Sequence, residues 1–273
     1  MPVMRLLKGD FLTKLIELNL EYNPKRQYEH TNECRAIEIK EELNIGVMVS
    51  PGMYIPDVIG AVDTLGALSN AKLHYIWKRE ETIKGILGPT IKATTTFSEC
   101  PQMDVLIVGA MMPKFCKDEQ ILDFLREQEP HAKAIVSICA GSLVVGSAGL
   151  LRGKIATSNF HMTSLLKHCG ALPTHKELVS SGKFYSAGPA IGSYEAALMV
   201  ARDLYGPDVA QFLEQEVLEY SPNPLFGVGS PSLAGKWLHT ISKILSLPSL
   251  PIFRRAMLNA YNKQKELPAT AFS

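Results

Sequence analysis

Long apolar runs, metal-ligand spacings and an excess of charge of one sign are all missing from this sequence of 273 residues. No apolar stretch approaches the roughly 18 residues that a membrane-spanning helix requires. The five cysteines are odd in number, and no two of them have CxxC spacing, which argues against a disulfide framework and a zinc site. The net charge of +1 gives no general sign of nucleic-acid binding.

A signal peptide is also missing from the pattern, because charged residues interrupt the apolar ones between Met1 and Lys14. Hydrophobic residues make up 46% and charged residues 20% of the chain, an ordinary balance for a globular domain. We therefore expect a cytoplasmic protein with reduced thiols. We also expect no metal, no cofactor and no nucleic-acid partner.

Short buried strands alternate with helices between residues 43 and 235. Apolar runs bounded by turn residues predict strands, and periodic apolar positions predict helices. The predicted strands are 45–50, 73–77, 105–108, 134–138 and 184–186, with a short extended segment at 154–157 and a Thr-rich hairpin or edge element at 91–97. The predicted helices are 57–68, 119–127, 141–150, 161–168 and 190–204. This alternation predicts an α/β fold with a mostly parallel sheet sandwiched by helices.

Two flanking segments differ from this core. Residues 1–42 are charge-rich, and we interpret them as an extension that wraps the core or contacts a partner. Residues 236–273 contain six Lys/Arg and a single acid, with apolar residues at helical spacing and a second helix predicted from Arg254. We favour a C-terminal extension docked on the core or on a dimer mate. The alternative is a membrane-surface or partner helix.

Cys139 stands at the junction between the predicted strand 134–138 and the helix that follows it. Ser137 and Gly141 flank it with small residues, which makes the segment a cysteine version of the nucleophile elbow. The N–H groups and dipole of the helix would lower the pKa of the thiol and favour the reactive thiolate. The alternative is an inert core cysteine, but the junction favours a reactive thiol.

Three strand ends are expected to meet at one crevice, because ligands bind at the carboxyl ends of parallel strands. Cys139 and Gly109 each follow a strand directly, and Asp57 lies just beyond the loop after the first strand. Asp57 is either an ordinary first-turn acid or, opposite a thiolate, a carboxyl group of raised pKa that passes protons. The backbone N–H groups of Gly109, Ala110 and Ala140 either hold developing negative charge or belong to plain loops.

Six further residues are predicted to shape the substrate pocket. Met111 and Met112 form an apolar wall or belong to the core, and His161 is the only histidine expected near the crevice. The full set is Tyr54, Met111, Met112, Asn159, His161 and Pro189.

The elbow belongs to a longer stretch, SICAGSLVVGSAGLLRGKIAT at residues 137–157, that carries a family likeness. Collinear support comes from PG at 51–52, DVIG at 57–60, HYIWK at 74–78, TTFSECP at 95–101 and LEYSP at 218–222. From about Asn44 to Gly235 the chain resembles the DJ-1/PfpI superfamily, and isocyanide hydratases in particular. The resemblance implies a flavodoxin-like, class I glutamine amidotransferase-like fold, a homodimer and a small-molecule substrate.

The resemblance also implies a hydro-lyase reaction. Cys139 would attack the terminal carbon of an isocyanide, Asp57 would act as acid and base, and an N-substituted formamide would form through a thioimidate.

Several positions depart from the hydratase pattern. Ala140 replaces a threonine, Asn159 replaces a histidine, and the segments 108–112 and 186–193 replace glycine-richer loops. Three hypotheses therefore stay open: an isocyanide hydratase-like enzyme, a diverged enzyme of specialised metabolism on the same scaffold, and a non-catalytic thiol sensor or binding protein.

Overall fold

A computed structural model describes residues 28–29, 42–222 and 229, and the C-terminal residues 237, 240–241, 243–244 and 247–265. Cys34 and most of the predicted N-terminal extension lie outside these residues. None of the helices in the described part of the chain is long and apolar enough to cross a membrane.

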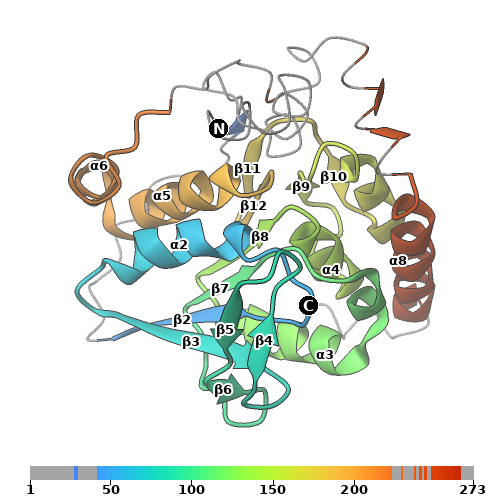
Figure 1. Ribbon diagram of the computed structural model, residues 1–273, viewed down its shortest axis with the longest axis horizontal. Helices are drawn as coiled ribbons and strands as arrows, with labels where there is room; N and C mark the ends of the chain where they lie inside the picture. Colours follow the sequence, from blue (N-terminus) through green and yellow to red (C-terminus); the bar gives the residue numbers. More distant parts are fainter. Residues whose placement is uncertain are drawn as a thin grey trace.

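A central sheet of eight strands runs through the molecule in the order β1-β11-β12-β8-β7-β2-β3-β6 (Figure 1). All neighbours in it are parallel except β11 and β12. Its strands are β1 (Tyr28–Glu29), β2 (Leu43–Met48), β3 (Ala71–Trp77), β6 (Thr95–Thr96), β7 (Val105–Val108), β8 (Ala134–Ile138), β11 (Leu178–Ser181) and β12 (Phe184–Ala187). Two small two-stranded sheets pair β4 (Thr82–Lys84) with β5 (Thr90–Lys92), and β9 (Ile155–Ala156) with β10 (Leu172–Pro173).

Helices cover both faces of this sheet, with α2 and α5 on one face and α3, α4 and α8 on the other (Figure 1). The α-helices are α2 (Pro56–Gly66), α3 (Glu119–Gln128), α4 (Gly141–Ser147), α5 (Ile191–Tyr205), α6 (Pro207–Phe212) and α8 (Leu250–Lys265). Short 3₁₀ segments are η1 (Pro113–Lys117), η2 (Glu129–His131) and η3 (Thr163–Cys169), and η4 (Leu213–Val217) is a π-helical turn. Every residue of β7 and β8 is buried, as expected for strands with helices on both faces.

The predicted α/β architecture is confirmed, and the strands 105–108 and 134–138 have the predicted bounds. The prediction also differs from the structure. It missed β4, β10 and α6 as well as β11, the antiparallel partner of β12, and the predicted helix 161–168 is the 3₁₀ segment η3. It extended α4 to residue 150, and it began the last helix at Arg254 instead of Leu250. Pro251 falls in the first turn of α8, where a helix tolerates proline because that N–H has no partner in the helix.

Parts of both predicted extensions contact the core. Residues 28–29 form β1, which pairs in parallel with β11 at the edge of the sheet. Helix α8 packs against η1, η3 and α4. It buries one apolar face, made by Phe253, Ala256, Met257 and Ala260. The spacing of these four residues is that of one side of an α-helix, which explains why α8 docks along its length.

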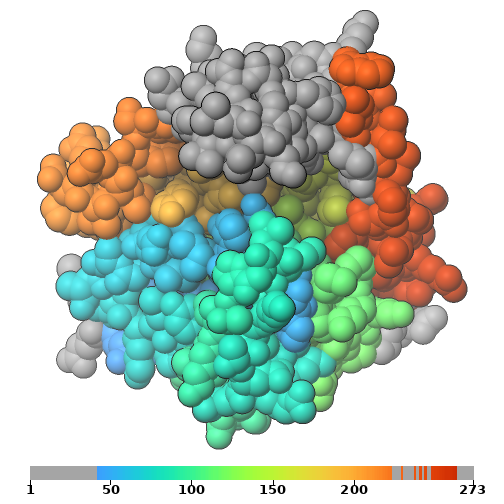
Figure 2. Space-filling model, viewed as in Figure 1, coloured from blue at the N-terminus to red at the C-terminus, as the bar shows by residue number. Residues whose placement is uncertain are grey.

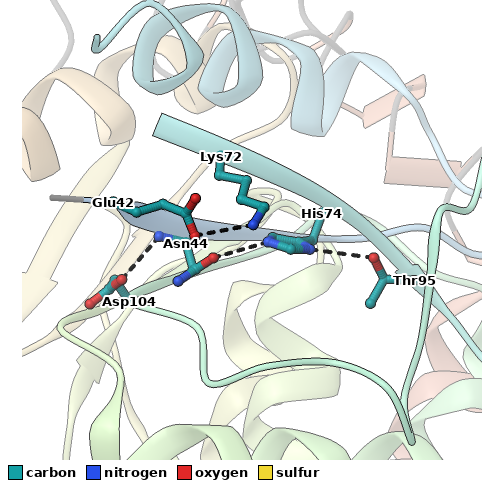
Figure 3. Close-up of polar contacts among 6 residues, drawn as sticks. All are labelled: Glu42, Asn44, Lys72, His74, Thr95 and Asp104. Carbon is teal, nitrogen blue, oxygen red and sulfur yellow. Dashed lines mark hydrogen bonds and ion pairs between the residues drawn. The ribbon is translucent and has the colours of Figure 1, made fainter. Parts of the chain in front are cut away.

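A polar network joins residues of β2, β3 and β6 with Asp104, which directly precedes β7 (Figure 3). The backbone N–H of Asn44 donates to Asp104 Oδ2 at 3.0 Å, and the Asn44 side-chain oxygen lies 3.0 Å from His74 Nε2. His74 Nδ1 lies 3.4 Å from the Thr95 hydroxyl. Burial lowers the pKa of His74, and nearby Lys72 lowers it further. This network links neighbouring strands of the sheet through their side chains.

Candidate functional site

Cys139 occupies a sharp turn between β8 and α4. Its φ of 55° places a non-glycine residue in the left-handed region, which is uncommon and typical of nucleophile elbows. The Cys139 N–H donates to the carbonyl oxygen of Ala187 at the end of β12, at 2.9 Å. That bond continues the pairing of β12 with β8 by one residue and helps to hold the strained turn.

Gly141 allows the tight approach that the elbow needs. A β-carbon at this position would lie 2.0 Å from the carbonyl oxygen of Val108 on β7. Gly109 has a similar role, since a β-carbon there would lie 2.7 Å from Val58 Cγ1 and 3.1 Å from Asp57 Cβ. The two glycines bring the strand ends and the start of α2 together, as the crevice predicted from the sequence requires.

Asp57 is fully buried and lies beside the thiol. Its Oδ1 accepts the N–H of Ala190 at 2.9 Å, and its Oδ2 accepts the N–H of Ala110 at 3.1 Å. Cys139 also forms a side-chain hydrogen bond with it. The carboxyl group therefore faces the cysteine while two backbone amides fix its orientation.

Burial raises the pKa of Asp57 from 3.8 to about 7, because desolvation disfavours the carboxylate. The hydrogen bonds from Ala190, Ala110 and Cys139 act in the opposite direction and stabilise the charged form. The result is a group that exchanges its proton near neutral pH, the property expected of a general acid and base.

Tyr54 borders the same pair. Burial raises the pKa of its phenol, and the charges of Asp57 and Cys139 raise it further. The Tyr54 N–H donates to the carbonyl oxygen of Ala110 at 3.4 Å. Tyr54 therefore keeps a neutral hydroxyl group near both Asp57 and Cys139.

The backbone N–H of Ala110 was one of three predicted to hold developing negative charge, but it has another partner. Its N–H donates to Asp57, so in this structure it orients the carboxyl group instead of pointing toward an anion. The Gly109 and Ala140 N–H groups remain candidates for holding negative charge next to Cys139.

The two methionines of this loop differ in exposure. Met111 is buried in the core, which was one of the two readings of this residue. Met112 is 40% exposed, and its side chain packs over Gly52, where a β-carbon would lie 3.2 Å from Met112 Cγ. Only Met112 is therefore placed to meet solvent at this loop.

Asn159 and His161 lie in a loop that is attached to the elbow. The hydroxyl of Ser158 donates to the Cys139 carbonyl oxygen at 2.6 Å. The Asn159 side-chain oxygen accepts the His161 N–H at 3.0 Å, and the ring of His161 lies 4.0 Å from that of Phe160. Pro189 precedes Ala190, whose amide bonds Asp57.

The sequence did not predict two residues that hydrogen-bond to Cys139 or Asp57. Ser158 stands beside the predicted Asn159, but nothing in a serine signals that it will bond a distant carbonyl. Ala190 has a φ of 53°, and its amide reaches Asp57 from a position 133 residues away. The adjacent proline was the only local signal of unusual backbone there.

The other described cysteines are unsuited to reaction. Burial raises the pKa of Cys100 to about 11, of Cys116 to about 12 and of Cys169 to about 11. These thiols stay protonated at neutral pH, and the thiol is much less nucleophilic than the thiolate. Among the residues that the structure describes, no group of three or more His, Cys, Asp or Glu could hold a metal ion.

The cysteine has a strained backbone, follows a central parallel strand and is hydrogen-bonded to a buried carboxyl group. These features define a class of α/β proteins with a cysteine elbow. The model of the DJ-1/PfpI family matches residues 44–202, and the chain belongs to this family.

Several relatives are similar over most of their length. The chain is 37% identical over 212 residues to isonitrile hydratase from Pseudomonas putida, covering 77% of this chain and 92% of that protein. Among solved structures, a ThiJ/PfpI family protein from Pseudomonas syringae has a TM-score of 0.75 and 28% identity, covering 79% of this chain and 90% of that one. Drosophila melanogaster DJ-1beta has a TM-score of 0.58 and 23% identity over 65% of this chain and 98% of its own, and shares the fold.

Proposed function

We propose that the protein is an isocyanide hydratase-like hydro-lyase in which Cys139 is the nucleophile and Asp57 the acid and base. The hydrogen bond between the strained Cys139 and the fully buried Asp57 carries the proposal. The identity of 37% with an isonitrile hydratase over most of the chain supports a small isocyanide as the substrate.

The first half of the reaction forms a covalent adduct. Ionised Asp57 takes the thiol proton of Cys139, and the sulfur attacks the terminal carbon of the isocyanide R–NC. The same carbon receives the proton from Asp57, so that Cys139–S–CH=N–R, a thioimidate, results. No atom is lost, and Asp57 returns to its ionised state.

The second half releases the product. Asp57 takes a proton from water while the hydroxide oxygen bonds to the thioimidate carbon, and the nitrogen receives that proton. Collapse of the resulting S–CH(OH)–NH–R group breaks the C–S bond. The hydroxyl proton returns to the sulfur through Asp57, and the N-substituted formamide leaves. In this proposal the N–H groups of Gly109 and Ala140 stabilise negative charge that develops beside the sulfur.

A panel of alkyl and aryl isocyanides tests the proposal, with formamide followed by chromatography. The wild-type protein should turn over at least one member. Cys139→Ala and Asp57→Asn should each lose at least about 100-fold in rate, the usual size of a nucleophile or acid–base contribution.

Cys100→Ser is the matched control, because Cys100 is a thiol of raised pKa that the proposal does not use. It should retain wild-type turnover. If no isocyanide is hydrated while Cys139 still reacts rapidly with an alkylating reagent, the hydratase proposal is wrong. In that case the diverged enzyme and the thiol sensor remain.

A further inference from the structure

A cavity lies between η1 and α8. It has a volume of about 580 Å³. Three cations and one amide line it together with apolar groups. The lining residues are Pro113, Lys114, Lys117, Pro251, Ile252, Arg255, Ala256 and Asn259. No carboxylate is among them, so the cavity has the charge of an anion site; we call it the basic cleft.

Among the residues that the structure describes, no carboxylate pairs with the cations of the basic cleft. Within the described residues, none of Lys114, Lys117 and Arg255 forms an ion pair. The acids that follow η1 have other partners. Asp118 accepts two bonds from Lys78, at 2.7 and 2.6 Å, and Glu119 lies 3.7 Å from Arg126. The field of the three cations is therefore open to a ligand.

The part of the chain that leads into α8 and forms it has no acid to repel an anion. From Tyr220 to Lys265 the sequence contains six Lys/Arg and not one Asp or Glu. Helix α8 occupies the right-hand edge of the molecule, where its outer side forms part of the surface (Figure 2). Because α8 is docked on the core through its buried face, its cations are held in place at that surface.

Large apolar side chains are exposed on the segment that leads into the basic cleft. Trp237 is 74% exposed, Ile244 56%, Leu247 49% and Ile252 58%. Ile252 also lines the cleft itself. An exposed tryptophan and aliphatic side chains beside lysines and arginines are the composition of a segment that lies at a membrane surface, with the rings at headgroup level.

We propose that the basic cleft binds the phosphate of an anionic phospholipid and that Trp237, Ile244, Leu247 and Ile252 enter the interface beside it. Charge and apolar area act together: the cations attract the anionic leaflet, and the exposed side chains bury apolar surface among the acyl chains. The protein then rests on the membrane without spanning it.

Vesicle sedimentation of the full-length protein tests the proposal. Binding should be measured at low salt to vesicles of phosphatidylcholine alone and of phosphatidylcholine with phosphatidylglycerol. The protein should sediment only with the anionic vesicles, and added salt should release it. The double variant Lys117→Gln, Arg255→Gln should bind about 25-fold more weakly. Each cation near the surface contributes about fivefold in affinity, and the variant removes two of them.

The variant Lys84→Gln, Lys92→Gln is the matched control. It removes the same charge from the exposed β4–β5 hairpin, none of whose residues lines the basic cleft. It should bind nearly as well as the wild type. Equal losses in the two double variants would reduce the effect to net charge and overturn the site.

Tryptophan fluorescence gives a second readout. The chain has two tryptophans, and Trp77 is only 4% exposed, so a change on binding reports Trp237. Anionic vesicles should shift the emission to shorter wavelength, and Trp237→Phe should abolish the shift.

Three results would overturn the proposal. The first is no binding to anionic vesicles at low salt. The second is equal sedimentation with vesicles of phosphatidylcholine alone, which would remove any role for the anionic headgroup in the basic cleft. The third is found without vesicles: acrylamide quenches the fluorescence of Trp237 less as the protein concentration rises. That result would make this face an interface between copies of the chain.

Discussion

At Gly141 the chain after Cys139 passes so close to β7 that a β-carbon would lie 2.0 Å from the Val108 carbonyl oxygen. Gly141→Ala should therefore lower the free energy of unfolding by about 3 kcal/mol, because backbone on both sides prevents relief of the clash. Urea unfolding measures this change. Gly153→Ala is the control, since its β-carbon would meet no atom within 4 Å and its left-handed backbone alone costs about 1 kcal/mol.

The thiols should differ sharply in reactivity. Cys139 should be alkylated by iodoacetamide well before Cys100, Cys116 and Cys169, whose pKa values burial raises to about 11 or 12. Peptide mass spectrometry after short exposure at neutral pH measures the order. If Cys139 is alkylated no faster than Cys100, the claim that it is a reactive thiol fails.

The pH dependence of turnover should follow Asp57. Only the ionised carboxylate can take the proton of Cys139, and the pKa of Asp57 is about 7. We therefore expect kcat/KM to rise as the pH passes from about 6 to 8. Rates measured with an isocyanide of the panel give the profile, and a rate that falls over this interval would contradict the assignment of Asp57 as the base.

At the scale of elements, the docking of α8 depends on its buried face. Met257 is fully buried, whereas Ile252 on the same helix is 58% exposed. Met257→Ala should lower the free energy of unfolding by about 2 to 4 kcal/mol, and Ile252→Ala by less than about 0.5 kcal/mol. Equal effects in urea unfolding would mean that α8 does not stabilise the folded core.

The elements that the sequence predicts well are those with a clear local pattern. Strand 105–108 is a short apolar run before a Gly, and it appears as β7 without change. Strand β11, LVSS, was missed because two of its four residues are polar, and its pairing with β12 comes from a hairpin and not from an apolar run. Helix α8 was started too late because Pro251 looks like a break, although the first turn accepts it.

The site was predictable where chemistry leaves a sequence motif and unpredictable where it depends on backbone placement. The positions of Cys139 and Asp57 after strands predicted that they lie close together, and the structure joins them by a hydrogen bond, whereas their catalytic roles stay predictions. The amide of Ala190 and the hydroxyl of Ser158 complete the arrangement through contacts across 133 and 19 residues. Such contacts depend on the fold, and an alanine offers no side-chain signal of its amide's partner.

At the scale of the whole molecule, Asp57 links stability to pH. Its pKa is 3.8 in the unfolded chain and about 7 in the folded protein, so the folded state keeps a proton that the unfolded state loses. This contribution to stability is complete below pH 4 and is lost as the pH rises through 7. The loss from this group is about 4 kcal/mol.

Urea unfolding at pH 5 and pH 8 measures that linkage. Asp57→Ala is the comparison, because it removes the titrating group and leaves the other ionisable residues in place. The wild type should lose more of its free energy of unfolding than the variant between the two pH values. Parallel curves would mean that Asp57 does not hold its proton in the folded state.

The two residues of β1 affect how readily the protein aggregates. They pair with Leu178 and Val179 and so cover part of the outer edge of the eight-stranded sheet. An open edge of unpaired N–H and C=O groups is a template on which other chains can add strands. At the opposite edge β6 is two residues long and pairs only with Ile76 and Trp77 of β3. The segment before the family domain therefore protects the sheet against intermolecular strand addition, and a chain that began at residue 42 should scatter light at concentrations where the whole chain stays clear.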